Sequence, residues 1–215
     1  MRTPRNSDTD TKILRHTLRV RVIHWLIALC FIAAMATGLA LYWASILRWM
    51  VPYFGGEQST IAIHFVAGLA LAIFALPMFF LWCQRMRWTA TDSYFIRHVR
   101  KYGMSPDQSP PADTGFFNGG QKLYFWAFIL STAWLLVTGL VWWWRREPWM
   151  PRPVYVVSRT GHRAVSVIMS GSLLIHIYKA TLGEPGTFAS MLQGTVTRNW
   201  ARLRRPGWFR DLGMK

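Results

Sequence analysis

Residues 161–182 read GHRAVSVIMSGSLLIHIYKATL, an apolar stretch of membrane-spanning length that carries two histidines. His162 and His176 are 14 residues apart in the sequence. At about 100° and about 1.5 Å per residue, this spacing places both on one helix face, to within about 40°, and about 21 Å apart along the axis. The two histidines therefore cannot bind the same metal ion, but each can serve a separate cofactor.

Three further stretches of similar length and composition precede this segment. About 20 apolar helical residues cross a hydrocarbon core of roughly 30 Å. Such stretches are too long for strands, and only helices or closed barrels span a membrane. We therefore predict an all-α membrane protein, a bundle of four transmembrane helices. The predicted spans are residues 22–43, 61–82, 123–144 and 161–182.

Charge and composition agree with this fold class. Charged residues make up 16% of the chain, whereas soluble domains average about 25%. The formal net charge is +16, and the tails and the second loop carry most of the Lys and Arg residues, while the first loop, residues 44–60, carries only Arg48. Because basic residues gather on the cytoplasmic side of membrane proteins, both termini are predicted to be cytoplasmic. The positive charge follows this topology rule, so it does not indicate binding to nucleic acid.

The chain is predicted to have three parts. Residues 1–21 form a cytoplasmic tail, and the span that follows serves as an uncleaved insertion signal. Residues 22–182 form the four-helix membrane domain. Residues 183–215 form a cytoplasmic amphipathic segment, in which the apolar positions of 187–204 are typical of one helix lying at the membrane surface.

The loops give three further predictions. Residues 93–102 are expected to form a short surface helix, with Thr91 or Asp92 as its cap. The third loop contains three prolines, at positions 148, 151 and 153, and is predicted to be non-helical. Cys30 and Cys83 are predicted to be structural thiols, because a cytoplasmic disulfide is unfavourable.

Four of the six histidines lie in the predicted spans or at their edges: His24, His64, His162 and His176. The other two, His16 and His98, lie in polar segments and are predicted to be solvated. Buried polar side chains are rare in membrane spans and tend to be functional there. One such histidine could be satisfied by an interhelical hydrogen bond, but four together favour a functional site.

The predicted topology assigns partners to these histidines. His24 opens an outward-running span and His176 ends an inward-running one, so both lie near the cytoplasmic side. His64 and His162 lie near the external side. Each pair comes from two helices, which suits a planar macrocycle with one imidazole on each face. We therefore predict two haems b, bound without covalent attachment because the chain has no Cys-x-x-Cys-His motif. A haem with two histidine ligands carries single electrons and has no open coordination position.

Residues near the histidines could complete these sites. Gly38 lies 14 residues after His24 and Gly68 one turn after His64, and each would leave room for a ring or for ordinary helix packing. Arg163 and Arg21 could bind haem propionates or simply anchor the helix ends at the interface. The sequence Thr37-Gly38-Leu39 recurs as Thr138-Gly139-Leu140, but this repeat is too short to indicate a duplication.

On the basis of these residues, the chain resembles the cytochrome b (gamma) subunit of respiratory membrane-bound formate dehydrogenases. The resemblance extends from Arg15 onward. The histidine pattern also fits the cytochromes of nickel–iron hydrogenase and thiosulfate reductase, but the Asn-x-Gly-Gln-Lys patch and the Arg-x-Trp-Ala tail favour formate dehydrogenase. Arg163 departs from the small residue expected in the family. The patches are Arg21-Val22-Ile23-His24-Trp25, Ile63-His64-Phe65 with Gly68, Phe117-Asn118-Gly119-Gly120-Gln121-Lys122, His176-Ile177-Tyr178 and Gly194-Thr195-Val196-Thr197-Arg198-Asn199-Trp200-Ala201.

The resemblance implies a function. In that family the four histidines hold two haems b, and electrons pass from an external iron–sulfur (beta) subunit through both haems to a quinone at the cytoplasmic side. The quinone site maps to Asn118, Gly120, Gln121 and His176. Formate oxidation belongs to a separate molybdenum or tungsten (alpha) subunit, because this chain has no pterin or iron–sulfur motif. The family also implies the bacterial inner membrane, contact with lipid, and complexes that often form trimers.

Other classes of membrane protein fit the sequence less well. A di-iron oxidase needs clustered His and Glu ligands at one depth, whereas the histidines here lie at two depths and the predicted spans contain no Asp or Glu. A transporter or a structural anchor would carry no haem.

Overall fold

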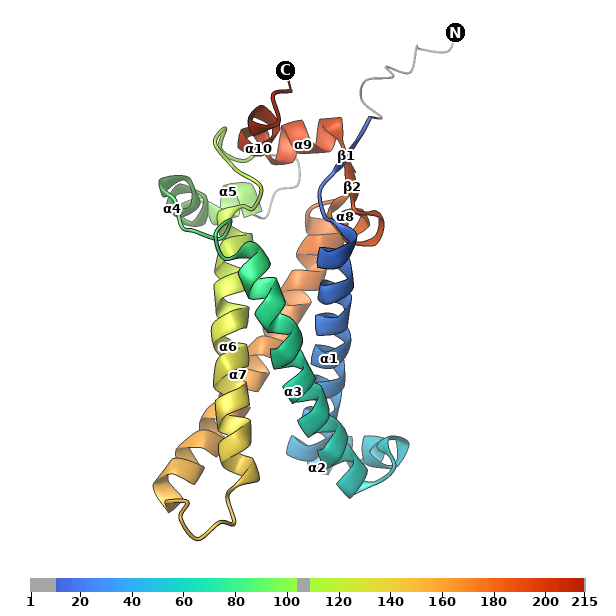
Figure 1. Cartoon of the computed structure of the whole chain (residues 1–215), viewed down its shortest axis with the longest axis vertical. Coiled ribbons are helices and arrows are strands. Elements are labelled where there is room, and N and C mark those ends of the chain that lie inside the picture. The colour runs from blue at the N-terminus through green and yellow to red at the C-terminus, as the bar shows by residue number, and fades with distance from the viewer. Residues whose placement is uncertain (1–10, 104–108, 215) are drawn as a thin grey trace. The chain divides into compact units, whose positions relative to one another are not determined.

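The computed structural model describes residues 11–103 and 109–214, so the first ten residues of the predicted tail lie outside the described chain. The chain divides into two compact units. Figure 1 shows its helices and strands, coloured from the N-terminus to the C-terminus. Unit 1 consists of Met1–Arg21, Leu81–Trp126 and Ile175–Lys215, and unit 2 of Val22–Phe80 and Ala127–Leu174. Most described residues are helical, as predicted. The described chain also contains two three-residue strands, which the sequence did not predict.

Among the described residues, four helices are long and apolar enough to cross a membrane, which confirms the predicted spans. The fourth helix begins at Arg152 rather than at residue 161, so the prediction that the third loop is non-helical throughout was wrong. Proline is tolerated in the first turn of a helix, where its missing N–H would have no partner, and Pro153 occupies such a position. The helices are α1 (Leu18–Tyr42), α3 (Glu57–Trp82), α6 (Gly119–Trp143) and α7 (Arg152–Tyr178), which continues into the π-helical turn η3 (Lys179–Gly183).

The core of unit 2 draws on all four long helices. Phe31 of α1, Leu71 of α3 and Met169 of α7 are buried against one another, and Phe128 of α6 packs on them. The outer surface of the same helices is apolar, and the side chains of Leu29, Val66, Leu130 and Ile168 are 63–67% exposed. An apolar exterior around an apolar core is the arrangement expected of a protein whose solvent is lipid.

A short connection joins α1 to α3 in unit 2. It consists of α2 (Ala44–Leu47) and the 3₁₀ helix η2 (Arg48–Phe54). Gly55 and Gly56 then take φ values of 83° and 95°, which L-residues with side chains rarely adopt. This turn reverses the chain and starts α3 at Glu57.

Unit 1 contains the small sheet. Strand β1 (Lys12–Leu14) pairs antiparallel with β2 (Thr195–Thr197), with Ile13 opposite Val196. These two residues are buried with Trp200, Trp208 and Phe209 in one apolar cluster. The sheet therefore fastens the start of the described chain to the segment that follows the last span.

The C-terminal segment is not the single helix that its apolar spacing predicted. It forms α8 (Thr187–Gln193), β2, α9 (Arg198–Arg204) and α10 (Pro206–Asp211). Gly194 ends α8 with φ of 85°, and a Cβ there would lie 2.8 Å from the His16 carbonyl oxygen. The buried residues of this segment pack within unit 1 instead of forming one continuous apolar face.

The second loop carries helices α4 (Ala90–Arg97) and α5 (Val99–Gly103) in place of the single helix predicted there. The cap of α4 is Thr89, not Thr91 or Asp92. The Thr89 hydroxyl accepts from the Asp92 N–H, and the Asp92 carboxylate accepts from the Thr89 N–H, which makes a capping box. Asp92 is therefore the third residue of the helix and the second partner in the box.

The two histidines outside the candidate site differ. His98 is exposed, as predicted. His16 is buried, with its ring centroid 5.5–6.4 Å from those of Trp82, Phe116 and Phe117, so the prediction of a solvated His16 was wrong. Its sequence neighbours are polar, but aromatic residues from distant segments enclose it. Neither Cys30 nor Cys83 forms a disulfide with another described residue.

Candidate functional site

The structure brings His64 and His162 together within unit 2. His64 is on α3 and His162 on α7, and their ring centroids are 6.1 Å apart with an interplanar angle of 68°. Two imidazoles that bind one metal ion from opposite sides, at about 2 Å each, have centroids roughly 6 Å apart. The spacing therefore fits two ligands of one metal ion.

Each of these imidazoles uses its Nδ1 atom to contact a neighbouring helix. His64 Nδ1 lies 2.9 Å from the Ala34 carbonyl oxygen and 3.2 Å from the Thr37 hydroxyl oxygen, both on α1. His162 Nδ1 lies 2.9 Å from the Thr138 hydroxyl oxygen on α6. With Nδ1 engaged in both rings, Nε2 is the nitrogen left to bind a metal, the division of roles common in metal-binding histidines.

Glycines lie against both imidazoles. A Cβ at Gly38 would lie 2.9 Å from His64 Cε1, so the close approach of α1 requires glycine there. A Cβ at Gly139 would lie 3.5 Å from His162 Cε1, an ordinary contact. At Gly68 a Cβ would meet no described atom within 4 Å, so protein packing does not demand that glycine. The space that Gly38 provides is filled by an imidazole, whereas Gly68 faces open space that suits a ring.

Arg163 and Arg21, the predicted propionate partners, make other contacts. The Arg163 guanidinium carbon lies 4.7 Å from the ring centroid of Tyr42 and 5.7 Å from that of Trp142, at cation–π distance. The Trp142 ring also meets His162 edge-on at 6.3 Å. Arg21 is in unit 1, where its Nη1 donates to the Leu192 carbonyl. Their roles as propionate partners stay predictions.

The residues of unit 2 fit a haem in donor chemistry. Two imidazoles lie 6.1 Å apart with Nε2 available, an open position lies one turn from His64, and the cation of Arg163 is beside His162 in sequence. The surroundings are apolar, which suits a macrocycle.

The other two histidines belong to different units. His24 is on α1 in unit 2, edge-on to Trp25 at 5.3 Å. His176 is on α7 in unit 1, stacked on Tyr124 at 4.7 Å with an interplanar angle of 15°. That His162 and His176 share one helix agrees with the sequence. The pairing of His24 with His176 stays a prediction.

The predicted quinone residues lie at the start of α6 in unit 1. Asn118 Oδ1 accepts from the Gln121 N–H at 2.9 Å, and Gln121 Oε1 accepts from the Asn118 N–H at 3.2 Å, which forms a reciprocal cap. Arg205 Nη2 also donates to Gln121 Oε1, at 3.1 Å. One turn further along α6, Tyr124 stacks on His176. The capping motif and His176 are thus connected through Tyr124, a residue that the sequence analysis did not single out.

Packing requires glycine at position 119 rather than at position 120. A Cβ at Gly119 would lie 2.8 Å from the Asp92 carbonyl oxygen. At Gly120 the nearest contacts would be 3.5 Å to Asn118 Oδ1 and 3.6 Å to Phe95, which are ordinary distances. The backbone of α4 therefore lies against the first residue of α6.

A buried ion pair supports this end of α6. Arg205, 1% exposed, donates to both carboxylate oxygens of Glu184, at 2.6 and 3.1 Å. Burial alone would raise the pKa of Glu184, but the charge and hydrogen bonds of Arg205, aided by Arg15 and Arg204, hold it below its usual value. Glu184 therefore stays ionised at neutral pH and fixes the guanidinium that contacts Gln121.

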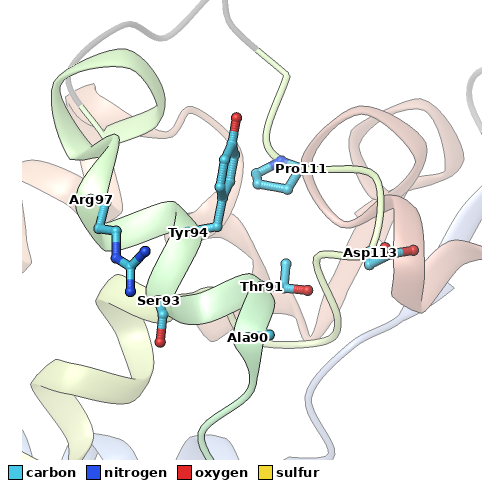
Figure 2. Close-up of a pocket in the computed structure, with 7 residues that line it drawn as sticks. All are labelled: Ala90, Thr91, Ser93, Tyr94, Arg97, Pro111 and Asp113. Atoms are coloured by element: carbon cyan, nitrogen blue, oxygen red, sulfur yellow. The ribbon is translucent and has the colours of Figure 1, made fainter.

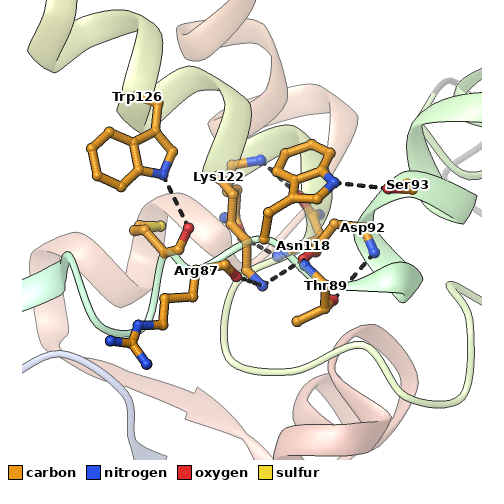
Figure 3. Close-up of polar contacts among 10 residues, drawn as sticks. Arg87, Thr89, Asp92, Ser93, Asn118, Lys122 and Trp126 are labelled. Atoms are coloured by element: carbon orange, nitrogen blue, oxygen red, sulfur yellow. Dashed lines mark hydrogen bonds and ion pairs between the residues drawn. The ribbon is translucent and has the colours of Figure 1, made fainter.

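Lys122 makes a second buried ion pair (Figure 3). Its Nζ donates to Asp92 at 2.7 Å and to the Arg87 carbonyl at 2.9 Å. Trp126, one turn later on α6, donates through Nε1 to the Met86 carbonyl at 3.0 Å. These bonds join α6 to the segment before α4. Lys122 is thus used inside the protein.

A surface pocket of about 580 Å³ also lies in unit 1 (Figure 2). It is formed by α4 and the segment that contains Pro111 and Asp113. None of the predicted haem or quinone residues lines it, so it is separate from the candidate site.

Known proteins of similar sequence indicate the family of this chain. Residues 15–194 match the family model of the prokaryotic cytochrome b561 proteins. The chain is 31% identical to the formate dehydrogenase cytochrome b556(fdo) subunit of Escherichia coli, with 93% of each chain covered. It is 29% identical to the formate dehydrogenase cytochrome b556 subunit of Haemophilus influenzae, covering 94% of this chain and 84% of that one.

A third relative is the cytochrome b556(Fdn) subunit of the nitrate-inducible formate dehydrogenase of Escherichia coli, 28% identical, with 93% of this chain and 91% of that one covered. The match covers His24, His64, His162 and His176 and most of the described residues. The chain therefore belongs to the prokaryotic cytochrome b561 family, within the group of cytochrome b subunits of formate dehydrogenases.

Proposed function

We propose that this chain is the membrane-anchoring, di-haem subunit of a formate dehydrogenase, carrying electrons from an external iron–sulfur subunit to a quinone at the cytoplasmic side. The observation that carries the proposal is the 6.1 Å separation of the His64 and His162 rings, each held through Nδ1. The names of the relatives support the assignment to formate dehydrogenase.

Two pairs of histidines would hold two haems b. His64 and His162 would bind the external haem, and His24 and His176 the cytoplasmic one. A haem held by two imidazoles takes up and releases one electron at a time and leaves no position for oxygen. The protein's own part is to hold neutral imidazoles in place and to surround them with apolar side chains.

The quinone would bind at the start of α6, beside Asn118, Gly120, Gln121 and His176. The cap and Arg205 use the amide oxygens of Asn118 and Gln121. The amide N–H groups of these side chains are then the donors that would meet a quinone oxygen. Tyr124, stacked on His176, would form part of the same wall.

The partners follow from the proposed role. The chain would bind an iron–sulfur (beta) subunit, which in turn binds the molybdenum or tungsten (alpha) subunit that oxidises formate. It would lie in the bacterial inner membrane with both termini cytoplasmic, and the whole complex would form a trimer. The alternative is the equivalent subunit of a nickel–iron hydrogenase or thiosulfate reductase, which the similarity to formate dehydrogenase subunits disfavours.

Haem counting tests the proposal. A dithionite-reduced minus oxidised spectrum of the full chain, purified with its complex, should show two non-covalent haems b per chain. Replacing His64 or His176 by Ala should each remove one haem, while the exposed His98→Ala control keeps both. A count of zero or one haem in the unmodified chain would refute the two-haem assignment. A purified complex whose haems are not reduced by formate would refute the assignment to formate dehydrogenase.

A further inference from the structure

One arrangement of residues occurs twice around the His64–His162 pair. Thr37 of α1 contacts His64 of α3, and Thr138 of α6 contacts His162 of α7. Both threonines are buried, at 0% and 3% exposure. Each is followed by a glycine that lies against the same imidazole. The helices that do not carry this pair of histidines thus supply the groups that touch them.

The hydrogen bonds of His64 fix the position of its ring proton. The Ala34 carbonyl oxygen, 2.9 Å from Nδ1, can only accept. The Thr37 hydroxyl has one proton and donates it to the Ala33 carbonyl at 2.7 Å, so its oxygen can only accept from the ring. Both contacts require a proton on Nδ1. Neutral His64 therefore carries its lone pair on Nε2.

The same reasoning applies to His162. Thr138 donates its hydroxyl proton to the Trp134 carbonyl at 2.7 Å, and its oxygen accepts from His162 Nδ1 at 2.9 Å. Thr138 donates to the carbonyl four residues before it, as Thr37 donates to the Ala33 carbonyl. The two imidazoles are therefore held in the same tautomer by two copies of one local arrangement.

We propose that Thr37-Gly38 and Thr138-Gly139 form paired cradles, which hold His64 and His162 as the Nδ1–H tautomer so that both Nε2 atoms serve one haem iron. This inference rests on the proposed function, since it assigns positioning residues to the external haem. An acceptor on the Nδ1 proton makes the imidazole a more basic ligand. Basic ligands favour the ferric state, so the cradles lower the midpoint potential of this haem.

Valine and serine variants of the full chain, purified with its complex, test the cradles. Valine matches threonine in shape but lacks the hydroxyl, whereas serine retains it. The experiment measures haem content, the midpoint potential of each haem by redox titration, and the low-spin ferric signals by electron paramagnetic resonance. Thr37→Val and Thr138→Val are expected to raise one midpoint potential and shift its resonance signal, leaving the other haem unchanged. Thr37→Ser and Thr138→Ser are expected to match the unmodified chain.

Two outcomes overturn the inference. In one, the valine variants keep the potentials and signals of the unmodified chain. In the other, a valine variant loses the haem and the serine variant at the same position loses it too, which assigns threonine a packing role. Loss of haem in a valine variant with retention in the serine variant supports a role for the hydroxyl. A His64→Ala variant, measured in the same experiment, distinguishes failure of this inference from failure of the proposed function. Unchanged haem content in that variant would refute the proposed function itself.

Discussion

Arg205 holds the carboxylate of Glu184 through two hydrogen bonds, at 2.6 and 3.1 Å, in a position where the side chain of Arg205 is 1% exposed. The same guanidinium reaches Gln121 at 3.1 Å. One buried ion pair therefore connects the end of the last span with the start of α6. The stability of unit 1 and the geometry of the predicted quinone residues depend on the same contact.

Glu184→Gln is expected to destabilise the protein strongly. It leaves a buried guanidinium without its counter-charge, and breaking such a pair costs about 3–5 kcal/mol. Thermal unfolding in detergent, followed by circular dichroism, measures the loss. The matched control is Asp113→Asn, which removes an exposed ion pair. The side chains of Arg210 and Asp113 are 61% and 71% exposed, so the loss of this pair should cost about 0–1 kcal/mol. Equal losses in the two variants would contradict the assigned importance of the buried pair.

The contribution of Glu184 should depend on pH in a defined direction. Its pKa in the folded protein lies below the ordinary value of 4.5, so the ionised form is favoured by folding. That stabilisation is present above the unfolded-state pKa and is lost as the pH falls through the lower folded-state pKa. The stability gap between the unmodified chain and Glu184→Gln should stay constant near neutral pH and shrink in acid. A gap that widened in acid would refute this account.

The two glycines beside the imidazoles should respond differently to alanine. A Cβ at Gly38 would lie 2.9 Å from His64 Cε1, whereas one at Gly139 would lie 3.5 Å from His162 Cε1. Gly38→Ala should force His64 to move, at an overpacking cost of about 1–3 kcal/mol, and should lower the content of one haem. Gly139→Ala should retain both haems, because the added methyl group would make only an ordinary contact with His162. The measurement is the haem content per chain. If both variants retained the same number of haems, α1 would have shifted to admit a methyl group.

Asn118 offers a way to separate capping from quinone binding. Asn118→Asp keeps the oxygen that caps α6 but removes the amide N–H donor, while Asn118→Ala removes both. The aspartate variant should keep the thermal stability of the unmodified chain, because Asp and Asn cap about equally well, and the alanine variant should lose about 1 kcal/mol. Both should slow reoxidation of the reduced haems by quinone. Reoxidation at the normal rate in Asn118→Asp would show that the Asn118 amide does not donate a hydrogen bond to quinone.

The fold followed from composition, whereas the contacts of the site did not. Apolar length alone located the four long helices and placed His162 and His176 on one of them. The hydroxyl contacts of Thr37 and Thr138 depend on how each helix is rotated about its axis, which no local pattern encodes. The repeated Thr-Gly-Leu was visible in the sequence, but its meaning required the imidazoles that face it.

Long-range packing explains two of the predictions that were wrong. His16 lies in a polar stretch, yet Trp82, Phe116 and Phe117 bury it. The apolar spacing of 187–204 predicted one helix, but Gly194 takes a left-handed φ and β2 pairs with β1. In both cases residues remote in sequence override the local pattern.

The pairing of β1 with β2 has a consequence for biosynthesis. Lys12 lies opposite Thr197, so the first strand is made long before its partner. At about 5–20 residues per second, the ribosome needs roughly 10–40 s to reach the second strand. During that interval β1 has no strand to pair with, while all four long helices are being inserted. Closure of the sheet is therefore a late event, and a chain that terminates before residue 195 would leave its N-terminal strand permanently unpaired and open to proteolysis.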